Sequence, residues 1–226
     1  ISYQLPLMDI DYAAAEVRRL AGLGARSIQI PNFPAELGMP DYHDTRYDKL
    51  WDAFCETGIV VANHLTLKNT LWDTFRRDPT PQKGIFTSLP PFALAETLAW
   101  YILTGVCERF PALKIVYVEP GLFWVPGYLR LLDERMHQHY QFPGVKELPS
   151  TYFKRQMAAT YVNESGIRDF VDTLGADNVM WSTDFPHPCC NWPNSQVLVE
   201  QQFAGFTEEE THKITWANGA RMYGVN

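Results

Sequence analysis

The hydrophobic pattern of the chain alternates between helix-like stretches and short, continuously apolar runs. Apolar residues recur at helical spacing over residues 11–23, 47–57, about 92–109, about 125–139 and 166–174. Apolar runs of strand length follow the helical stretches, some directly and one after an irregular segment. Five strands are therefore predicted, at residues 27–30, 59–62, 114–118, 157–162 and 178–182.

Polar residues mark where several of these helices begin and end. Asp9 or Asp11 is placed to cap the first helix, and Gly24 is its stop signal. The last helix begins at Thr207, where Glu210 three residues later completes a capping box, and it is expected to extend to about residue 223. The helices are thus delimited by local chemistry as well as by periodicity.

Continuous apolar strands that alternate with helices predict an α/β fold with a parallel sheet. A doubly wound sheet and a (β/α)8 barrel both fit this alternation. Polar residues such as His64, Glu119 and Asp184 fall at the ends of different strands, as in a barrel, whereas an open sheet binds its ligand mainly at one switch point. A single barrel domain over residues 1–226 is therefore predicted.

Composition narrows the class of protein. With 226 residues, 46% hydrophobic content and 14% aromatic content, the chain can bury the core of one domain. The net charge is −7 and there is no run of Lys or Arg, so nucleic acid and anionic membranes are excluded as expected partners. No apolar stretch reaches the roughly 20 residues that span a bilayer, and a cytoplasmic location is the default expectation.

The strongest chemical signal lies in the segment 181–188. Asp184 stands at the tip of an apolar strand, with His187 three residues later. An aspartate in that position can ligate a divalent metal and accept a proton from metal-bound water. It can equally cap the turn that contains Pro186, and the residues by themselves leave both roles open.

Two further strand ends hold candidate residues. His64 lies at the end of the strand 59–62, after Asn63. Imidazole is the commonest nitrogen ligand of zinc, so His64 is a candidate metal ligand. The alternative is a loop histidine that only forms hydrogen bonds. Glu119 follows the strand 114–118, ahead of a Gly121 turn that would leave it facing the barrel mouth. Glu119 is predicted to be a ligand, a proton shuttle or a substrate-orienting group, with an ion pair to a neighbouring residue as the alternative.

Four segments, in this order, resemble one known family. They are residues 110–116, 119–126, 182–187 and 218–223. Together they resemble the amidohydrolase-related (amidohydrolase 2) TIM-barrel proteins. That family contains metal-dependent hydrolases and decarboxylases similar to aminocarboxymuconate-semialdehyde decarboxylase, and the resemblance extends over nearly the whole chain.

The resemblance implies a metal site. In the family, two histidines on strand 1, one histidine at the end of strand 5 and one aspartate at the end of strand 8 bind the metal, and His64 and Asp184 match the last two by position. The chain would then contain only strands 4–8, with strands 1–3 upstream of Ile1, and would hold metal poorly by itself. Many relatives have a strand 6 histidine where this chain has Glu119, which leaves hydrolysis and decarboxylation both open.

The sequence therefore predicts a metal-dependent hydrolase for a small carboxylated or carbonyl-bearing molecule. His64 and Asp184 are expected to hold zinc or manganese, with Asp184 as general base and Glu119 as proton shuttle or orienting group. The residues expected to contact substrate at the mouth are Asn63, Trp124 and His187. A metal-dependent decarboxylase of the same family is the alternative.

A second alternative is a non-catalytic barrel remnant. Five strands cannot close an eight-stranded barrel, so unpaired edges would favour a partner, such as a second copy of the chain in a homo-oligomer. The segment 66–91 is long for a connection and is predicted to be a lid or specificity loop. Its arginines Arg76 and Arg77 are expected either to meet a substrate carboxylate or to lie on the surface.

Overall fold

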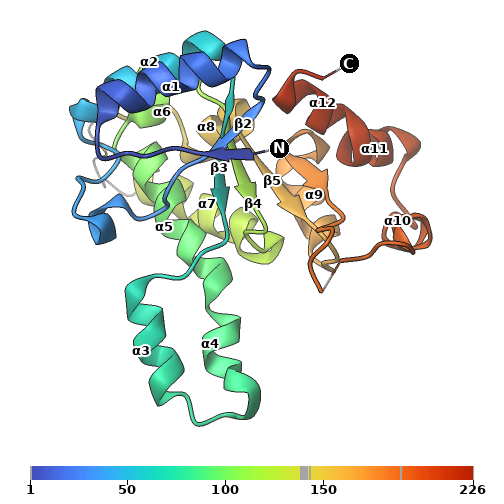
Figure 1. Ribbon diagram of the computed structural model, residues 1–226. Helices are drawn as coiled ribbons and strands as arrows, with labels where there is room; N and C mark the ends of the chain where they lie inside the picture. Colours follow the sequence, from blue (N-terminus) through green and yellow to red (C-terminus); the bar gives the residue numbers. More distant parts are fainter. Residues whose placement is uncertain (1, 138–141, 143, 189, 226) are drawn as a thin grey trace.

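A parallel sheet forms the centre of the molecule. The computed structural model describes residues 2–137, 142, 144–188 and 190–225. Its strands lie side by side in sequence order and every neighbouring pair is parallel (Figure 1). They are β1 (Ser2–Gln4), β2 (Ser27–Gln29), β3 (Val60–His64), β4 (Ile115–Val118), β5 (Met157–Tyr161) and β6 (Val179–Trp181). A sequential order has no point of reversal, so the sheet has the strand order of a barrel and not of a doubly wound fold.

The sheet contains one strand more than the five predicted. β1 lies outside the five predicted strands, and it pairs with β2 in the register Ser2↔Ser27 and Tyr3↔Ile28. Three residues with a single aromatic side chain form no apolar run, so the hydrophobic pattern could not predict this strand. The prediction that only strands 4–8 are present is therefore not supported. Within the described residues, β1 and β6 each pair on one side, which leaves the sheet open.

Helices connect the strands and cover one face of the sheet (Figure 1). They are α1 (Ile10–Gly22), α2 (Asp48–Thr57), α3 (Asn69–Arg77), α4 (Gly84–Ser88), α5 (Pro90–Leu103), α6 (Val106–Arg109), α7 (Val125–His137), α8 (Pro149–Gln156), α9 (Ile167–Leu174), α10 (Ser195–Gln202), α11 (Glu208–His212) and α12 (Asn218–Tyr223). The predicted helix at 125–139 begins as expected, but its residues 138 and 139 lie outside the described residues.

The predicted helix ends are confirmed where a side chain makes the cap. The Asp9 carboxylate accepts a hydrogen bond from the Tyr12 amide at 3.0 Å, and the capping box of Thr207 and Glu210 is present. The helix predicted at 92–109 is instead broken between α5 and α6, because Gly105 has φ = +80°. The last helix is also interrupted, by a π-helical segment at Lys213–Ala217 between α11 and α12.

Successive residues of each strand face opposite sides of the sheet. Val61, Ile115 and Ala159 point to the helix-covered face and belong to the main hydrophobic core. Val60 and Val116 point to the other side, called here the inner face, where they pack with Met222 of α12. This alternation also sets which side chains at the strand ends share a face.

Buried amide side chains tie successive units together at the amino ends of the strands. Gln156, Asn178 and Asn218 are each at most 3% exposed and donate through their NH2 groups. Gln156 donates to the carbonyl oxygens of Phe110 and Leu113. Asn178 donates to those of Lys154 and Met157, and Asn218 to those of Ala176 and Val179. Because these carbonyls are buried, the amides satisfy groups that water cannot reach.

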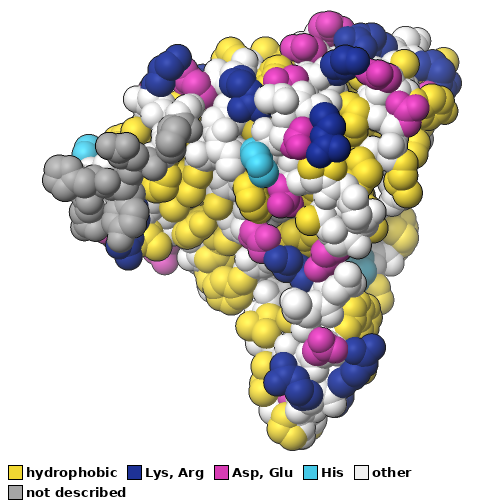
Figure 2. Space-filling model, turned by 90° about the vertical axis from the view of Figure 1, so that its left-hand side faces the viewer, with side chains coloured by type: hydrophobic (Ala, Val, Ile, Leu, Met, Phe, Trp, Pro, Cys, Tyr) yellow, Lys and Arg dark blue, Asp and Glu magenta, His cyan; other side chains and the backbone are white. Residues whose placement is uncertain are grey.

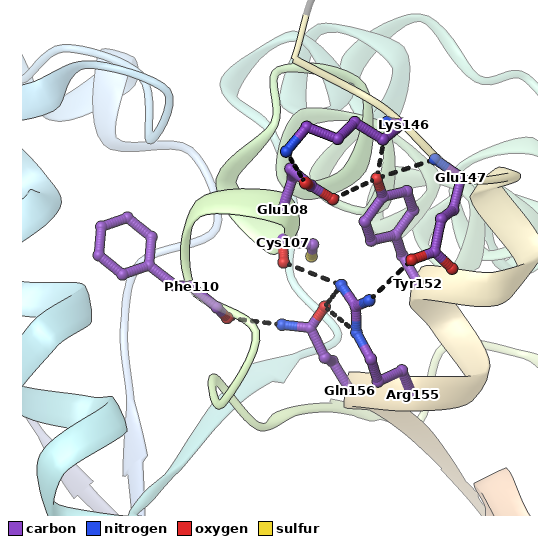
Figure 3. A network of polar contacts seen from close by, with 8 residues as sticks. All are labelled: Cys107, Glu108, Phe110, Lys146, Glu147, Tyr152, Arg155 and Gln156. Carbon is purple, nitrogen blue, oxygen red and sulfur yellow. Dashed lines mark hydrogen bonds and ion pairs between the residues drawn. The ribbon is translucent and has the colours of Figure 1, made fainter.

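Gln156 belongs to a larger polar network between α6 and α8 (Figure 3). The Arg155 guanidinium donates to the Gln156 side-chain oxygen at 3.1 Å and to the Cys107 carbonyl at 3.2 Å. The Tyr152 hydroxyl donates to the Glu108 carboxylate at 2.8 Å. These contacts hold α8 against α6 and so place β5 next to β4.

Replacing Gln156 with leucine is expected to lower the free energy of unfolding by about 1–3 kcal/mol, because the buried Phe110 carbonyl loses its donor. Urea unfolding followed by circular dichroism measures the change. The control is Glu147→Gln, which removes a half-exposed ion pair to Arg155 at 3.4 Å and is expected to cost less than about 1 kcal/mol. Equal costs for the two variants would contradict the role of the buried amide.

Candidate active site

Polar side chains gather at the edge of the sheet where the parallel strands end. His64 is the last residue of β3, Glu119 directly follows β4, and Glu164 and Asp184 come shortly after β5 and β6. Carboxyl ends of parallel strands lie at one edge, and this edge forms the active site in barrel enzymes. The structure thus places His64, Glu119 and Asp184 at the common edge that the sequence predicted.

The His64 ring is held from both sides. Its Nδ1 lies 2.8 Å from the Leu65 carbonyl oxygen, and its Nε2 lies 3.2 Å from Oε2 of Glu119. A proton on Nδ1, donated to the carbonyl, leaves the Nε2 lone pair facing a carboxylate. Such a pair of acceptors is stabilised when a cation lies between them or the ring takes a second proton. Metal-binding histidines commonly use this backbone contact to orient the ring.

A residue that the sequence analysis missed fixes the end of β3. Asn32, in the loop after β2, is 6% exposed, and its Nδ2 donates to the His64 carbonyl oxygen at 2.6 Å. No motif marks this contact, because it joins residues that are 32 positions apart in the sequence. The position of His64 therefore depends on both neighbouring segments, the loop after β2 and the turn after β4.

At two candidate residues the backbone adopts a conformation that is unfavourable for residues other than glycine. Glu119 and Asp184 both have φ = +56°, in the left-handed region that glycine adopts at least cost. In the described residues, the other non-glycine residues with positive φ are Gln82 and Lys83, which lie in a surface turn. Glycine would adopt these turns at less cost than Glu or Asp, so the sequence does not use the residue type that suits the backbone here. Such strain is concentrated at functional sites.

Asp184 uses its backbone for the turn and keeps its carboxylate for other contacts. Its carbonyl oxygen accepts from the His187 amide at 2.7 Å, while its Oδ2 lies 3.1 Å from His187 Nδ1. The Asp184 side chain is 20% exposed and the His187 side chain 59% exposed. The role of Asp184 in the turn is therefore present and uses its backbone carbonyl, whereas its role as metal ligand or proton acceptor stays a prediction.

Glu164 is a half-buried carboxylate next to the Glu119 turn. Its Oε2 accepts from the Leu122 amide at 2.6 Å. Burial raises the pKa of Glu164, the Leu122 hydrogen bond lowers it, and the charge of Glu119 raises it again, with a net increase above the ordinary value of 4.5. The sequence placed Glu164 at a strand end but offered no reason to single it out.

The raised pKa of Glu164 makes stability depend on pH. The folded protein binds this proton more tightly than the unfolded chain, so wild-type stability falls as pH rises from 4.5 through the folded pKa. Glu164→Gln keeps an acceptor for Leu122 and removes the charge. We expect the melting temperature of the variant, relative to wild type, to increase from pH 4 to pH 7 in thermal unfolding. Exposed Glu200→Gln should show no such trend, and a flat difference for Glu164→Gln would contradict the assignment.

The structure places two of the expected substrate contacts away from the mouth. Asn63 is fully buried beside Tyr101, on the helix-covered face, because it directly precedes His64 on β3 and so points the opposite way. Trp124 is 8% exposed and its Nε1 donates to the Pro120 carbonyl at 2.6 Å, so the indole folds under its own turn. Its neighbour Phe123 is exposed instead.

A cavity of about 500 Å³ lies on the inner face of the sheet. His64 borders it together with Gln29, Ala62 and Val118, whereas Glu119 and Asp184 are not among its lining residues. In the part of the chain that the structure describes, no three His, Cys, Asp or Glu residues come together as a metal site. His64 with Glu119, and Asp184 with His187, form two separate pairs.

The donor atoms of these pairs suit a metal such as manganese or zinc. An imidazole nitrogen and carboxylate oxygens are the ligands that both metals accept in proteins. The orientation of His64 by the Leu65 carbonyl leaves Nε2 available as a ligand. The pairs therefore fit part of a metal site and do not make a complete one.

A family model described as "Amidohydrolase" matches residues 3–225. A solved amidohydrolase from Mycobacterium avium subsp. paratuberculosis is similar over 99% of this chain and 57% of its own, with 24% identity and a TM-score of 0.84. A 5-carboxyvanillate decarboxylase from Sphingomonas paucimobilis is similar over 99% of this chain and 66% of its own, with 23% identity and a TM-score of 0.80.

A third solved structure contains a metal. It is a dihydroxybenzoic acid decarboxylase from a Polaromonas species, with bound manganese and the inhibitor 2-nitroresorcinol. It is 19% identical over 97% of this chain and 67% of its own, with a TM-score of 0.78. The chain thus spans 57% to 67% of the length of these three proteins. Within the described ranges, no helix combines the length and the apolar character needed to cross a membrane.

Proposed function

The chain belongs to the amidohydrolase family, and on that premise we propose that it acts as a metal-dependent decarboxylase of a small carboxylated aromatic molecule. The observation that carries the proposal is the pair of strand-end carboxylates, Glu119 and Asp184, both held in left-handed backbone conformations and each beside a histidine. Two of the similar solved structures are decarboxylases of hydroxylated aromatic acids, which favours this reaction over the hydrolysis expected first.

His64 and Asp184 are the residues proposed to hold the metal, with manganese preferred because a similar solved structure contains it. Bound there, the ion would polarise the substrate carboxylate and offset its negative charge. We also propose that the complete fold is a closed (β/α)8 barrel, in which other strands supply further ligands to the metal. Glu119, whose Oε2 lies 3.2 Å from His64 Nε2, is proposed to orient the substrate beside the metal.

Decarboxylation exchanges one bond on carbon for another. The carbon–carboxylate bond breaks, CO2 leaves, and a proton takes its place on the carbon. Asp184 is proposed to deliver that proton, since it lies at the sheet edge and its carboxylate contacts the His187 ring. His187 is more exposed than Asp184 and is placed to return a proton from solvent. Neither Asn63 nor Trp124 is used, because both are buried.

Hydrolysis is the second candidate, favoured by the family model itself. In this reaction water adds to the carbonyl carbon while the Asp184 carboxylate accepts its proton, and the proton passes to the leaving group as the bond from that group to the carbonyl carbon breaks. Glu119 orients the carbonyl substrate. The same residues serve both reactions, because both need a group at Asp184 that transfers a proton. The choice between them therefore needs a chemical assay.

The test is an assay of CO2 release from 2,6-dihydroxybenzoate and 5-carboxyvanillate with added manganese, and in parallel an assay of ester and amide hydrolysis. In deuterated water, the decarboxylated product should contain deuterium at the carbon that lost CO2. Hydrolysis without CO2 release would establish the second candidate. Failure of both reactions, together with no manganese binding, would support a non-catalytic barrel remnant.

A further inference from the structure

Side chains from the neighbouring βα unit hold the turn that carries Glu119. The left-handed backbone of Glu119 directs the chain out of the sheet, so the amides of this turn need acceptors other than a neighbouring strand. The Glu119 amide donates to Oγ1 of Thr160 at 3.2 Å. The Leu122 amide donates to Oε2 of Glu164 at 2.6 Å. Thr160 lies on β5 and Glu164 shortly after it, so both acceptors come from the next strand of the sheet.

The same turn is also fixed from within. The Trp124 indole donates to the Pro120 carbonyl oxygen at 2.6 Å. Gly121 has φ = +75°, and a Cβ added there would lie 2.8 Å from the Phe123 ring, closer than such contacts occur. Each residue of the turn 119–122 is therefore constrained, either by a side-chain hydrogen bond or by the space around it.

The turn determines where the Glu119 carboxylate lies relative to His64. The Leu65 amide donates to the Val118 carbonyl oxygen at 3.0 Å and so joins the ends of β3 and β4. From this common base, Oε2 of Glu119 lies 3.2 Å from Nε2 of His64. Glu119 at φ = +56° would relax to negative φ if the turn were released, and this change redirects its side chain. The contact with His64 thus depends on the contacts that hold the turn.

Glu164 is the stronger of the two acceptors, because an ionised acceptor forms a shorter and stronger hydrogen bond than a hydroxyl. The charge of Glu119 raises the pKa of Glu164, so the two groups repel each other when both are charged. In the part of the chain that the structure describes, Glu164 forms no hydrogen bond or ion pair with His64 or Asp184. Its contact with Leu122 is therefore its link to the candidate site.

The long segment 66–91 does not hold the turn. It was expected to be a lid or specificity loop, and it forms α3 and α4, a hairpin that projects from the body of the molecule (Figure 1). Figure 2 shows this projection with charged and hydrophobic side chains on its surface, and Arg76 and Arg77 are both exposed. Among the described residues, no hydrogen bond, ion pair or ring contact joins α3 or α4 to residues 119–122.

We propose that Glu164 and Thr160 are positioning residues, which hold the Glu119 turn so that the Glu119 carboxylate faces His64. Neither residue contacts the substrate in this proposal, so both act through Glu119. The inference rests on the proposed function only for the role of Glu119 toward the substrate. The hold on the turn itself is a property of the fold and can be measured without any reaction.

Amide hydrogen exchange, followed by NMR on the full chain of 226 residues, tests the hold on the turn. Glu164→Ala removes the acceptor, so the Leu122 amide should exchange at least about tenfold faster, the low end for a hydrogen bond to a charged group. Glu164→Gln keeps an oxygen acceptor and should bring this rate back to within about threefold of wild type. Thr160→Val should accelerate exchange of the Glu119 amide in the same way.

The matched control for exchange is Ser165→Ala, an exposed serine next to Glu164 in the same loop. Both amides should exchange at the wild-type rate in this variant. An unchanged Leu122 rate in Glu164→Ala would overturn the proposal. A rate in Glu164→Gln as fast as in Glu164→Ala would also overturn it, since the hydrogen bond would then not be the hold.

The ring resonances of His64 test whether the turn places the Glu119 carboxylate, again without substrate. Glu119→Gln removes the charge 3.2 Å from Nε2 and gives the resonance positions of a ring without its partner. The His64 resonances in Glu164→Ala should move toward those positions, and in Ser165→Ala they should stay where they are in wild type. Resonances that do not move in Glu164→Ala would contradict the positioning role.

A double-mutant cycle tests the consequence for turnover. Glu164→Ala should lower kcat/KM about tenfold or more in the wild-type background, the cost of a misplaced orienting group. In the Glu119→Gln background the same change should cost less than about twofold, because its effect passes through Glu119. Equal losses in both backgrounds would overturn that route. A wild type without turnover would refute the proposed function alone, since exchange and the His64 resonances decide the positioning role independently.

Discussion

Asp184→Asn is expected to lower turnover of the decarboxylated substrate about a hundredfold to ten-thousandfold, the usual contribution of a positioned proton donor or base. Asparagine preserves the shape of the side chain and the backbone turn to His187, but it neither donates nor accepts the transferred proton. The same loss is expected if the reaction is hydrolysis. Steady-state rates of CO2 release, or of hydrolysis, measure the effect.

The control for Asp184 is the same change on an exposed helix. Asp169→Asn lies on α9, away from the sheet edge, and should leave the rate within twofold of wild type, as for ordinary surface substitutions. Thermal unfolding of both variants separates a loss of folding from a loss of chemistry. Activity of Asp184→Asn above a tenth of wild type would remove Asp184 from the proposed mechanism.

His64→Asn is expected to weaken manganese binding at least tenfold, because it removes the nitrogen proposed as a ligand and leaves Glu119 without its partner. Loss of an orienting contact alone already weakens metal sites by about 10–100-fold. Titration of free manganese by electron paramagnetic resonance measures the affinity without any need for substrate. This readout is independent of whether the enzyme decarboxylates or hydrolyses.

His43→Asn provides the matched control for metal binding. His43 is an exposed histidine that stacks on Trp100, with ring centroids 5.0 Å apart, and lies outside the strand ends. Its replacement should leave the manganese affinity unchanged. Equal affinities for wild type and His64→Asn would show that the metal binds elsewhere, whatever the rate of reaction.

Several features of this protein follow from local sequence alone. Burial on the helix-covered face requires apolar side chains at fixed spacing, so the five strands and the helices α1, α2 and α9 were predicted within about two residues of their observed bounds. The helix N-caps formed by Asp9 and Thr207 could also be predicted, because each cap joins residues that are three positions apart in the sequence. The α/β class follows from the same pattern, whereas the barrel was predicted from the polar residues at the ends of different strands.

Other elements could be found only in the folded molecule. β1 has no apolar run and lies beside β2, and α3 and α4 contain no buried residue. The identity of the candidate residues at the strand ends was predictable, because their position after an apolar strand is local. Which of them face the same side was not, as the opposite orientations of Asn63 and His64 show.

The sequence by itself thus determined which polar residues end the strands, since strand length and apolar content are local properties. Only the tertiary structure decided that the His64 ring meets Glu119. The physical reason is that this contact joins residues of separate βα units, whose positions depend on further hydrogen bonds between units, such as the one from Asn32 to His64. Contacts of that kind leave no periodic signal in a single chain.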